Sequence, residues 1–209
     1  MTDLVPLAVL TGDLIGSSGL APERIEEAFA VLDSAAERIA AWQGHPTSLS
    51  RYRGDGWQIV VMRPRLALRA ALVLRAALRA RGHDLSTRIA LASGQDRPPH
   101  LPDLNLAMGP VFVASGRALD AIEAPAQMVL AGGGALGAAV RLADALSQGW
   151  TQAQARAILP MLAPVPPTRI LVAESLGIRR QAVEQALLAA DYPALSQALE
   201  MIEAAQDAG

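Results

Sequence analysis

Two aspartates in glycine-rich turns are the residues of this chain best suited to bind a metal ion. Asp55 lies between Gly54 and Gly56, and Asp13 follows an apolar run that ends in Thr-Gly. Gly-Asp-Gly between two apolar segments indicates a β-hairpin, because the favoured tight turns need residues that adopt positive φ. If one sheet brings both carboxylates together, their oxygens suit Mg²⁺, which commonly takes one or two carboxylates plus substrate phosphates.

Each aspartate also has a purely structural interpretation. Asp13 could cap the turn that follows its strand, and Asp55 could be an ordinary hairpin residue, since aspartate is common in turns. The choice between these interpretations depends on whether the fold places the two turns side by side.

The spacing of apolar residues predicts the element order β-α-β-β-α-β-α-β in the first 131 residues. The expected elements are a strand at 4–12, a helix from 22 to about 42, strands at 48–53 and 57–62, a helix at 64–81, a strand at 87–93, a helix at 110–123 and a strand at 127–130. The first six elements follow the ferredoxin-like or palm order. That order predicts an α+β domain with an antiparallel sheet, helices on one face, and the first strand beside the hairpin.

The helix expected at 64–81 carries an apolar stripe that would face the core. Four arginines lie outside this stripe and are expected on its outer side: Arg65, Arg69, Arg75 and Arg79. All 18 basic residues of the chain are arginine. A bias in the base composition of the coding sequence or a need for bidentate phosphate contacts would each explain that preference.

The run 131–134, Ala-Gly-Gly-Gly, is the best domain boundary in the chain. After it the strand signals stop, so we expect a palm-like domain at 1–131 and a helical domain at 132–209. Residues 168–188 read TRILVAESLGIRRQAVEQALL. Their small residue, turn glycine and branched apolar residue have the spacing of a helix-turn-helix.

In a DNA-binding interpretation, the second helix of this motif would enter the major groove, where arginine and glutamine read guanine and adenine. The residues expected to contact DNA are Arg169, Arg179, Arg180, Gln181, Glu184 and Gln185. Residues 151–209 contain four arginines and six acidic residues, whereas phosphate binding favours the opposite sign. A three-helix packing unit used for dimerisation therefore remains an alternative.

Composition excludes several other classes of protein. The 209 residues include no cysteine, so disulfides and thiolate metal sites are absent. The formal net charge is −2, which predicts neither a polyanion-binding nor a polycation-binding protein. The mean hydropathy is +0.27, yet no uninterrupted apolar stretch reaches the length of a membrane span. A cytoplasmic protein without membrane contact is the expectation.

The N-terminal part resembles the catalytic domain of class III nucleotide cyclases. The matching segments are LTGDLIGSS (10–18), RYRGDGWQIVV (51–61), TRIALASG (87–94) and GPVFVASGRALDAI (109–122), in that order. The resemblance covers about residues 4–131. Its combination with a helix-turn-helix also resembles SatD-family proteins and some proteins labelled MarR-like regulators.

The resemblance implies roles for individual residues. Asp13 and Asp55 would hold Mg²⁺ or Mn²⁺ ions that bind a triphosphate and activate its 3′-hydroxyl. Arg117 matches the arginine that stabilises the transferring phosphoryl group, although Val113 stands where an asparagine is usual. Arg51 stands in place of the purine-reading lysine. Gly54 and Gly56 belong to the predicted nucleotide-binding turn, and Arg53 beside it could either meet a phosphate or pair with a charge on the neighbouring strand. The acidic partner of that lysine is replaced by Leu106.

Three functions follow as hypotheses. The first is a DNA-binding transcriptional regulator whose cyclase-like domain senses a nucleotide and dimerises, because class III cyclases build their sites at a homodimer interface. The second is an active cyclase that uses two metal ions. The third is a scaffold that has lost its ligand. The metal and phosphate features persist while the base-selecting ones are weak, so the sequence supports nucleotide binding better than cyclisation.

Overall fold

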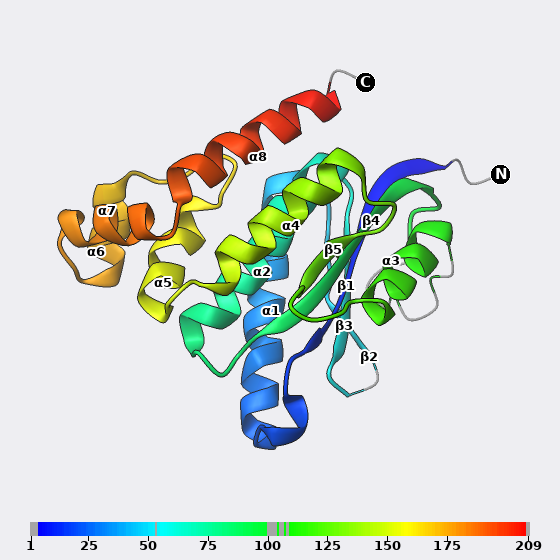
Figure 1. Cartoon of the computed structure of the whole chain (residues 1–209), viewed down its shortest axis with the longest axis horizontal. Coiled ribbons are helices and arrows are strands. Elements are labelled where there is room, and N and C mark those ends of the chain that lie inside the picture. The colour runs from blue at the N-terminus through cyan, green and yellow to red at the C-terminus, as the bar shows by residue number, and fades with distance from the viewer. Residues whose placement is uncertain (1–3, 53, 100–103, 105–106, 108, 208–209) are drawn as a thin grey trace.

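A five-stranded sheet lies at the centre of the N-terminal part (Figure 1). The computed structural model describes residues 4–52, 54–99, 104, 107 and 109–207. The strands are β1 (Val5–Leu14), β2 (Ser50–Tyr52), β3 (Gly56–Val61), β4 (Thr87–Asp96) and β5 (Met128–Leu130), in the order β2-β3-β1-β4-β5. The first four strands have the order that the ferredoxin-like fold requires, and the predicted α+β class is confirmed.

Helices and short 3₁₀ turns connect these strands and continue beyond them. They are η1 (Ser17–Gly19), α1 (Pro22–Gln43), η2 (Pro64–Leu66), α2 (Ala67–Arg81), α3 (Pro110–Asp120), α4 (Gly134–Gln148), α5 (Gln152–Met161), α6 (Arg169–Leu176), α7 (Arg180–Ala189) and α8 (Tyr192–Asp207). The order of helices and strands predicted for residues 1–131 is confirmed, and the described elements that follow β5 are helices, as predicted.

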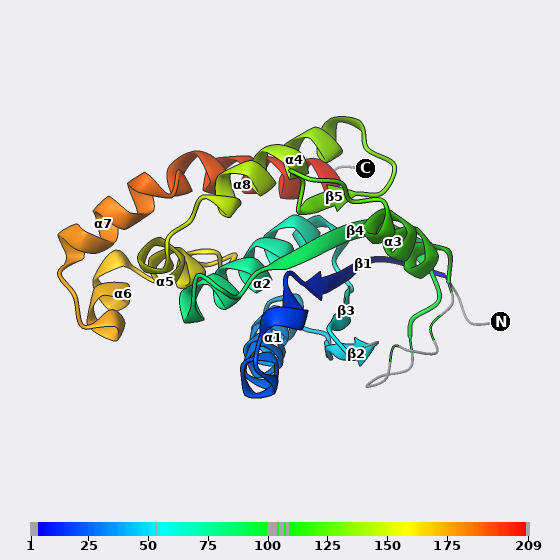
Figure 2. The same cartoon turned by 60° about the horizontal axis from the view of Figure 1, so that its bottom comes forward.

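The central strand β1 is buried on both faces, which corrects the expectation of helices on one face only. Alternate side chains of a strand point to opposite faces. Leu10 belongs to the large cluster that includes α1 and α2, whereas Val9 packs in a second cluster with Phe112 of α3. Figure 2 shows α3 apart from α1 and α2. The continuous apolar run of β1 is typical of a strand covered on both faces.

The sequence predicted an antiparallel sheet, and this holds for β1 to β4 but not for β5. β1 pairs antiparallel with β3 and with β4, but β5 runs parallel to β4. A parallel neighbour requires a crossover connection, and α3 supplies it by passing over the sheet face opposite α1.

Two arginines of α2 are buried, although the sequence predicted them outside the core-facing stripe. Arg69 is 4% exposed and Arg75 is 3% exposed. The C-terminal helices cover this side of α2 and bring carboxylates to both side chains. Glu203 of α8 accepts from Arg69 at 2.6 Å, and Asp144 of α4 accepts from Arg75 at 2.7 Å. The prediction was wrong because the pattern of one helix does not reveal which later segment will cover it.

Asp144 joins three elements from a fully buried position. Its second carboxylate oxygen accepts from Arg141 and from the backbone N–H of Gln127, each at 3.0 Å. Burial lowers the pKa of Arg75, and the charge of Asp144 opposes that effect. Asp144 therefore fixes α2 and the start of β5 relative to α4.

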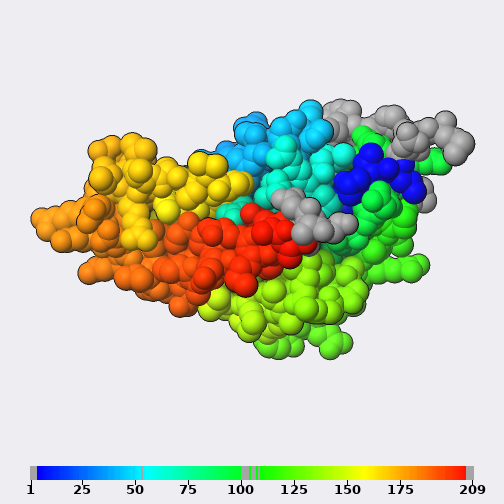
Figure 3. Space-filling model, turned by 90° about the horizontal axis from the view of Figure 1, so that it is seen from above, coloured from blue at the N-terminus to red at the C-terminus, as the bar shows by residue number. Residues whose placement is uncertain are grey.

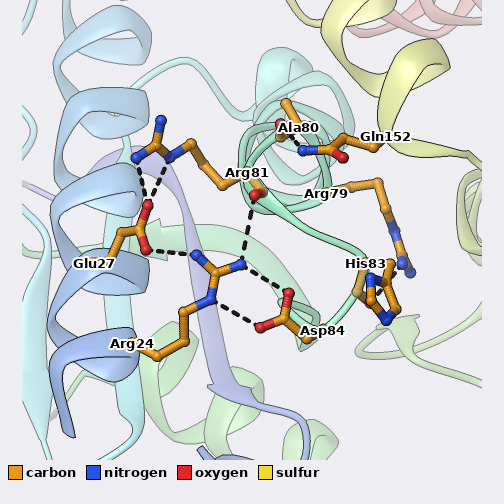
Figure 4. Close-up of polar contacts among 8 residues, drawn as sticks. All are labelled: Arg24, Glu27, Arg79, Ala80, Arg81, His83, Asp84 and Gln152. Carbon is orange, nitrogen blue, oxygen red and sulfur yellow. Dashed lines mark hydrogen bonds and ion pairs between the residues drawn. The ribbon is translucent and has the colours of Figure 1, made fainter. Parts of the chain in front are cut away.

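A surface ion-pair cluster holds the start of α1 against the end of α2 (Figure 4). Arg24 donates to both oxygens of Asp84, at 2.7 and 2.8 Å, and to Glu27 at 2.5 Å. Arg81 binds the same Glu27. These hydrogen bonds lower the pKa of Asp84 to about 2, with Arg24 as the main cause.

The C-terminal helices pack against the sheet domain. One hydrophobic cluster includes Leu10 of β1, Leu74 of α2, Val140 of α4 and Leu199 of α8, and Figures 2 and 3 show α8 beside α4. The proposed boundary after residue 131 stays a prediction, and the hydrophobic packing is continuous across it.

Candidate cation and nucleotide site

Both sequence-predicted metal ligands line one surface pocket of about 460 Å³. The pocket lies at the end of the sheet that is formed by the C-terminal end of β1 and the β2–β3 turn. Its walls are formed by Asp13, Leu14, Ile15, Gly16, Ser17, Ser18, Asp55, Arg88, Ile122, Ala124, Ala126 and Gln127. Two carboxylates, one guanidinium and a glycine-serine loop therefore share one cavity.

Strand pairing brings the two aspartates together. Asp13 pairs with Gly56 in the β1–β3 register, and the N–H of Leu14 donates to the Asp55 carbonyl at 3.2 Å. Gly54 has a φ of 84°, so the turn uses the left-handed conformation that glycine adopts readily. The hairpin turn is thus tied to the last residue of β1.

Gly12 permits the close packing that holds Asp13 in place. A Cβ at this position would lie 2.3 Å from Cζ2 of Trp57 and 2.5 Å from the Arg88 carbonyl. The Trp57 indole donates to Thr87 at 3.0 Å, and the Thr87 hydroxyl donates to the Asp13 carbonyl at 2.6 Å. Since Trp57 is fully buried, the backbone of Asp13 is fixed from the core side.

Each carboxylate already has a partner within the protein. Both oxygens of Asp13 accept from Arg88, with Nε to Oδ1 at 2.9 Å. Asp55 accepts from the Ser17 hydroxyl at 2.5 Å. The pKa of Arg88 is raised, chiefly by its hydrogen bond to Asp13 and then by the charges of Asp13, Asp120 and Asp55.

Arg88 is the pocket residue that sequence reasoning missed. It stands directly opposite Asp13 in the β1–β4 register. A charged residue at the start of an otherwise apolar strand was the available signal, but the register that gives it meaning is a tertiary property.

Two side chains of the pocket, Asp13 and Asp55, are of the type that could ligate a hard divalent cation. Carboxylate oxygens are the protein ligands that Mg²⁺ and Mn²⁺ prefer, and Mg²⁺ usually keeps waters and substrate phosphates as its other ligands. Within the described part of the chain, no three or more histidine, cysteine or acidic residues gather closely enough to form a site made of protein ligands alone. The two aspartates therefore match a cation shared with a phosphate ligand.

Arg117 lines a different pocket, also of about 460 Å³. That pocket lies between α3 and the sheet and includes Thr11, Tyr52, Gln58 and Asp120. The structure does not bring Arg117 into the cavity of the two aspartates within a single chain.

Buried polar contacts anchor α3 over this second pocket. The hydroxyls of Thr11 and Ser115 are 2.7 Å apart, and Gln58 donates to Thr11 at 2.9 Å. At the start of α3, the N–H of Val111 donates to Asp96 at 2.9 Å. A Cβ on Gly109 would lie 2.0 Å from the Asp96 carboxylate, so the glycine allows this approach.

Arg51 points towards α1 rather than into either pocket. Its guanidinium binds Glu26 at 2.6 Å and the Gly54 carbonyl at 2.7 Å, and lies 4.0 Å from the ring centre of Phe29. Tyr52 faces the second pocket, and its ring packs 2.9 Å from where a Gly56 Cβ would be. Arg53 and Leu106 lie outside the described residues.

Helices α6 and α7 have the local features that the sequence predicted for residues 168–188. Gly177 ends α6 with a φ of 65°, and Ala173 and Val183 are buried between the helices. Of the residues expected at DNA, five are exposed: Arg169, Arg179, Arg180, Gln181 and Gln185. Glu184 is half-buried, 3.8 Å from Arg169 and 3.5 Å from Arg180.

Among the helices that the structure describes, none has the combination of length and apolar composition that crossing a bilayer requires.

Comparison with known proteins found likenesses in structure only. No protein-family model matches the chain, and no curated protein sequence matches it. A bacterial light-regulated adenylyl cyclase is 18% identical and has a TM-score of 0.45, covering 61% of this chain and 76% of its own. The catalytic core of a rhodopsin-guanylyl cyclase in complex with ATPalphaS is 19% identical with a TM-score of 0.47, covering 61% and 78%. The adenylyl cyclase CyaB from P. aeruginosa is 18% identical with a TM-score of 0.39, covering 62% and 78%.

Proposed function

We propose that this chain binds a nucleoside triphosphate together with a divalent cation. The observation that supports this function is that Asp13 of β1 and Asp55 of the β2–β3 turn line one pocket with Arg88 and the 14–18 loop. The carboxylates would hold Mg²⁺ or Mn²⁺, and the cation would neutralise the phosphates that complete its coordination. Arg88 offers a planar guanidinium suited to a phosphate.

The position of Arg117 supports a homodimer as the binding unit. In one chain Arg117 and the aspartates line different pockets. In a two-fold dimer whose interface includes both pockets, the Arg117 pocket of each copy could face the Asp13–Asp55 pocket of the other, because in an isologous interface residue i contacts residue j and j contacts i. Light scattering with and without nucleotide tests this arrangement.

Calorimetric titration of the full chain with each nucleoside triphosphate, in Mg²⁺ or Mn²⁺ and in chelator, tests the proposed function. Binding should require the cation and should be lost in Asp13→Asn and Asp55→Asn. Asp84→Asn is the matched control, because Asp84 is also paired with an arginine but lies away from the pocket. Binding that survives both pocket substitutions, or no binding to any triphosphate, would contradict the proposal.

Chromatographic analysis of the same mixtures separates a sensor from an enzyme. A sensor leaves the triphosphate intact. The alternative, a class III-type cyclase, releases a cyclic nucleotide and pyrophosphate at a rate that Asp55→Asn and Arg117→Ala abolish. The sensor is favoured because Val113 stands where the cyclases have an asparagine one helical turn before Arg117.

A second function, DNA binding by α6 and α7, is supported by the exposed second helix. Arg179, Arg180, Gln181 and Gln185 are exposed on or beside α7, while Val183 is buried beneath it. In this proposal the chain is a transcriptional regulator whose nucleotide site controls operator binding. Glu184 screens Arg180, so affinity should depend on reading bases as well as on phosphate contacts.

Selection from a random DNA library at moderate salt, followed by anisotropy titration, tests the DNA proposal. Arg180→Gln should weaken binding to the selected site by about 5- to 150-fold, since a good bidentate base contact contributes about 1–3 kcal/mol. Arg81→Gln removes an exposed arginine outside α6 and α7 and should leave DNA binding unchanged. If no preferred sequence emerges, α6 and α7 serve packing or dimerisation instead.

A further inference from the structure

The pair formed by Arg88 and Asp13 occupies the position that a cation would need. The two residues stand opposite one another in the β1–β4 register, and Arg88 engages both carboxylate oxygens of Asp13. A divalent cation that binds Asp13 competes with the guanidinium for these oxygens. The resting site therefore contains its own counterion.

Asp55 presents no comparable obstacle. Its partner is the Ser17 hydroxyl, which is neutral and can rotate to donate elsewhere. Of the two ligands, Asp13 is the one at which a cation competes with a charged side chain.

Asp120 is a further acidic residue on this side of the sheet. It is the last residue of α3, the helix that covers the sheet face to which Thr11 and Asp13 both belong. Its charge adds to the raised pKa of Arg88, after the hydrogen bond and charge of Asp13. Arg88 is 39% exposed, so it has the freedom to turn.

We propose that Arg88 is the resident counterion of the Asp13–Asp55 site, and that a divalent cation binds by displacing it from Asp13 towards Asp120. This inference rests on the proposed cation site and adds its regulation. Asp120 lines the Arg117 pocket, so the exchange moves a positive charge from one pocket towards the other. Occupancy of the cation site thereby changes the electrostatics of the surface on which Arg117 lies.

Manganese binding to the full chain without nucleotide tests the exchange, with free Mn²⁺ followed by its paramagnetic resonance signal. Arg88→Met should tighten binding by about tenfold, the scale of one charge-assisted hydrogen-bonded pair. Asp120→Asn should weaken binding by about threefold in the wild-type background and have no effect in Arg88→Met, because the receiving group then has nothing to receive. Arg81→Met, which breaks an exposed pair with Glu27, is the matched control and should leave Mn²⁺ affinity unchanged.

If wild type binds Mn²⁺ and Arg88→Met binds it no more tightly, the counterion role of Arg88 is refuted, while the cation site itself is not. If Asp120→Asn weakens binding equally in both backgrounds, Asp120 acts only as a distant charge and the transfer is refuted. If neither wild type nor Arg88→Met binds Mn²⁺, the cation site itself fails, and the proposed function fails with it. Thermal unfolding of each variant without metal separates these results from misfolding.

Discussion

Gly12→Ala should destabilise the fold by about 3 kcal/mol. A Cβ would lie 2.3 Å from Cζ2 of Trp57 and 2.5 Å from the Arg88 carbonyl, whereas non-bonded carbon atoms pack best at about 3.5–4.0 Å. Overpacking a core position costs about 1–3 kcal/mol. The upper end applies because one of the two contacts is backbone within the β1–β4 pairing and cannot move alone. For a chain of this size the midpoint of thermal unfolding should fall by about 6–12 °C.

Calorimetry or circular dichroism of the variant measures this loss, and Gly19→Ala is the matched control. Gly19 is exposed, and a Cβ there would meet nothing within 4 Å, so its free energy of unfolding should change little. A loss below about 1 kcal/mol in Gly12→Ala would refute the argument, because it would mean that β1 and β4 separate easily at this point.

A second substitution shows which contact limits the variant. Trp57→Phe removes the atom nearest the new Cβ but leaves the Arg88 carbonyl in place. The double variant should therefore be more stable than the sum of the single changes predicts, yet still less stable than wild type. Full recovery would show that the indole alone had opposed the Cβ.

The remaining predictions concern polar contacts away from the cation pocket. Asp144→Asn should lower the free energy of unfolding by about 3–5 kcal/mol, because it leaves Arg75 charged and buried without its counterion. Arg141→Gln removes only an exposed partner of the same carboxylate and should lower it by less than about 1 kcal/mol. Equal losses for the two variants in chemical denaturation would contradict this argument. Asp96→Ala should lower the free energy of unfolding by about 1–3 kcal/mol, because it leaves a buried backbone N–H at the start of α3 unpaired. An unchanged free energy of unfolding in the same assay would show that water takes the place of the carboxylate as acceptor. The pKa of Asp84 is lowered from 3.8 to about 2, so its contribution is present above pH 3.8 and is lost as the pH falls towards 2; Asp84→Asn should flatten the pH dependence of stability in that window, and an unchanged profile would exclude the ion pair as its source.

Local sequence patterns determined the elements and their order. The left-handed residues Gly54 and Gly177 were predictable from their neighbours, because turns and helix ends depend on a few consecutive residues. The ferredoxin-like order then placed the hairpin beside the first strand, and with it Asp55 beside the end of β1. Element order and turn chemistry were sufficient for that much of the candidate site.

Only the tertiary structure decided what each side chain contacts. Arg75 was expected outside the core and is buried, because α4 covers it and brings Asp144, 69 residues later in the chain, into contact with it. The contacts of Arg51 with Glu26 and Phe29 of α1 were not part of its predicted role in nucleotide binding, which stays a prediction. Arg88 gained its importance from pairing with Asp13, seventy-five residues away. Such contacts arise from the packing of distant segments, and no local periodicity encodes them.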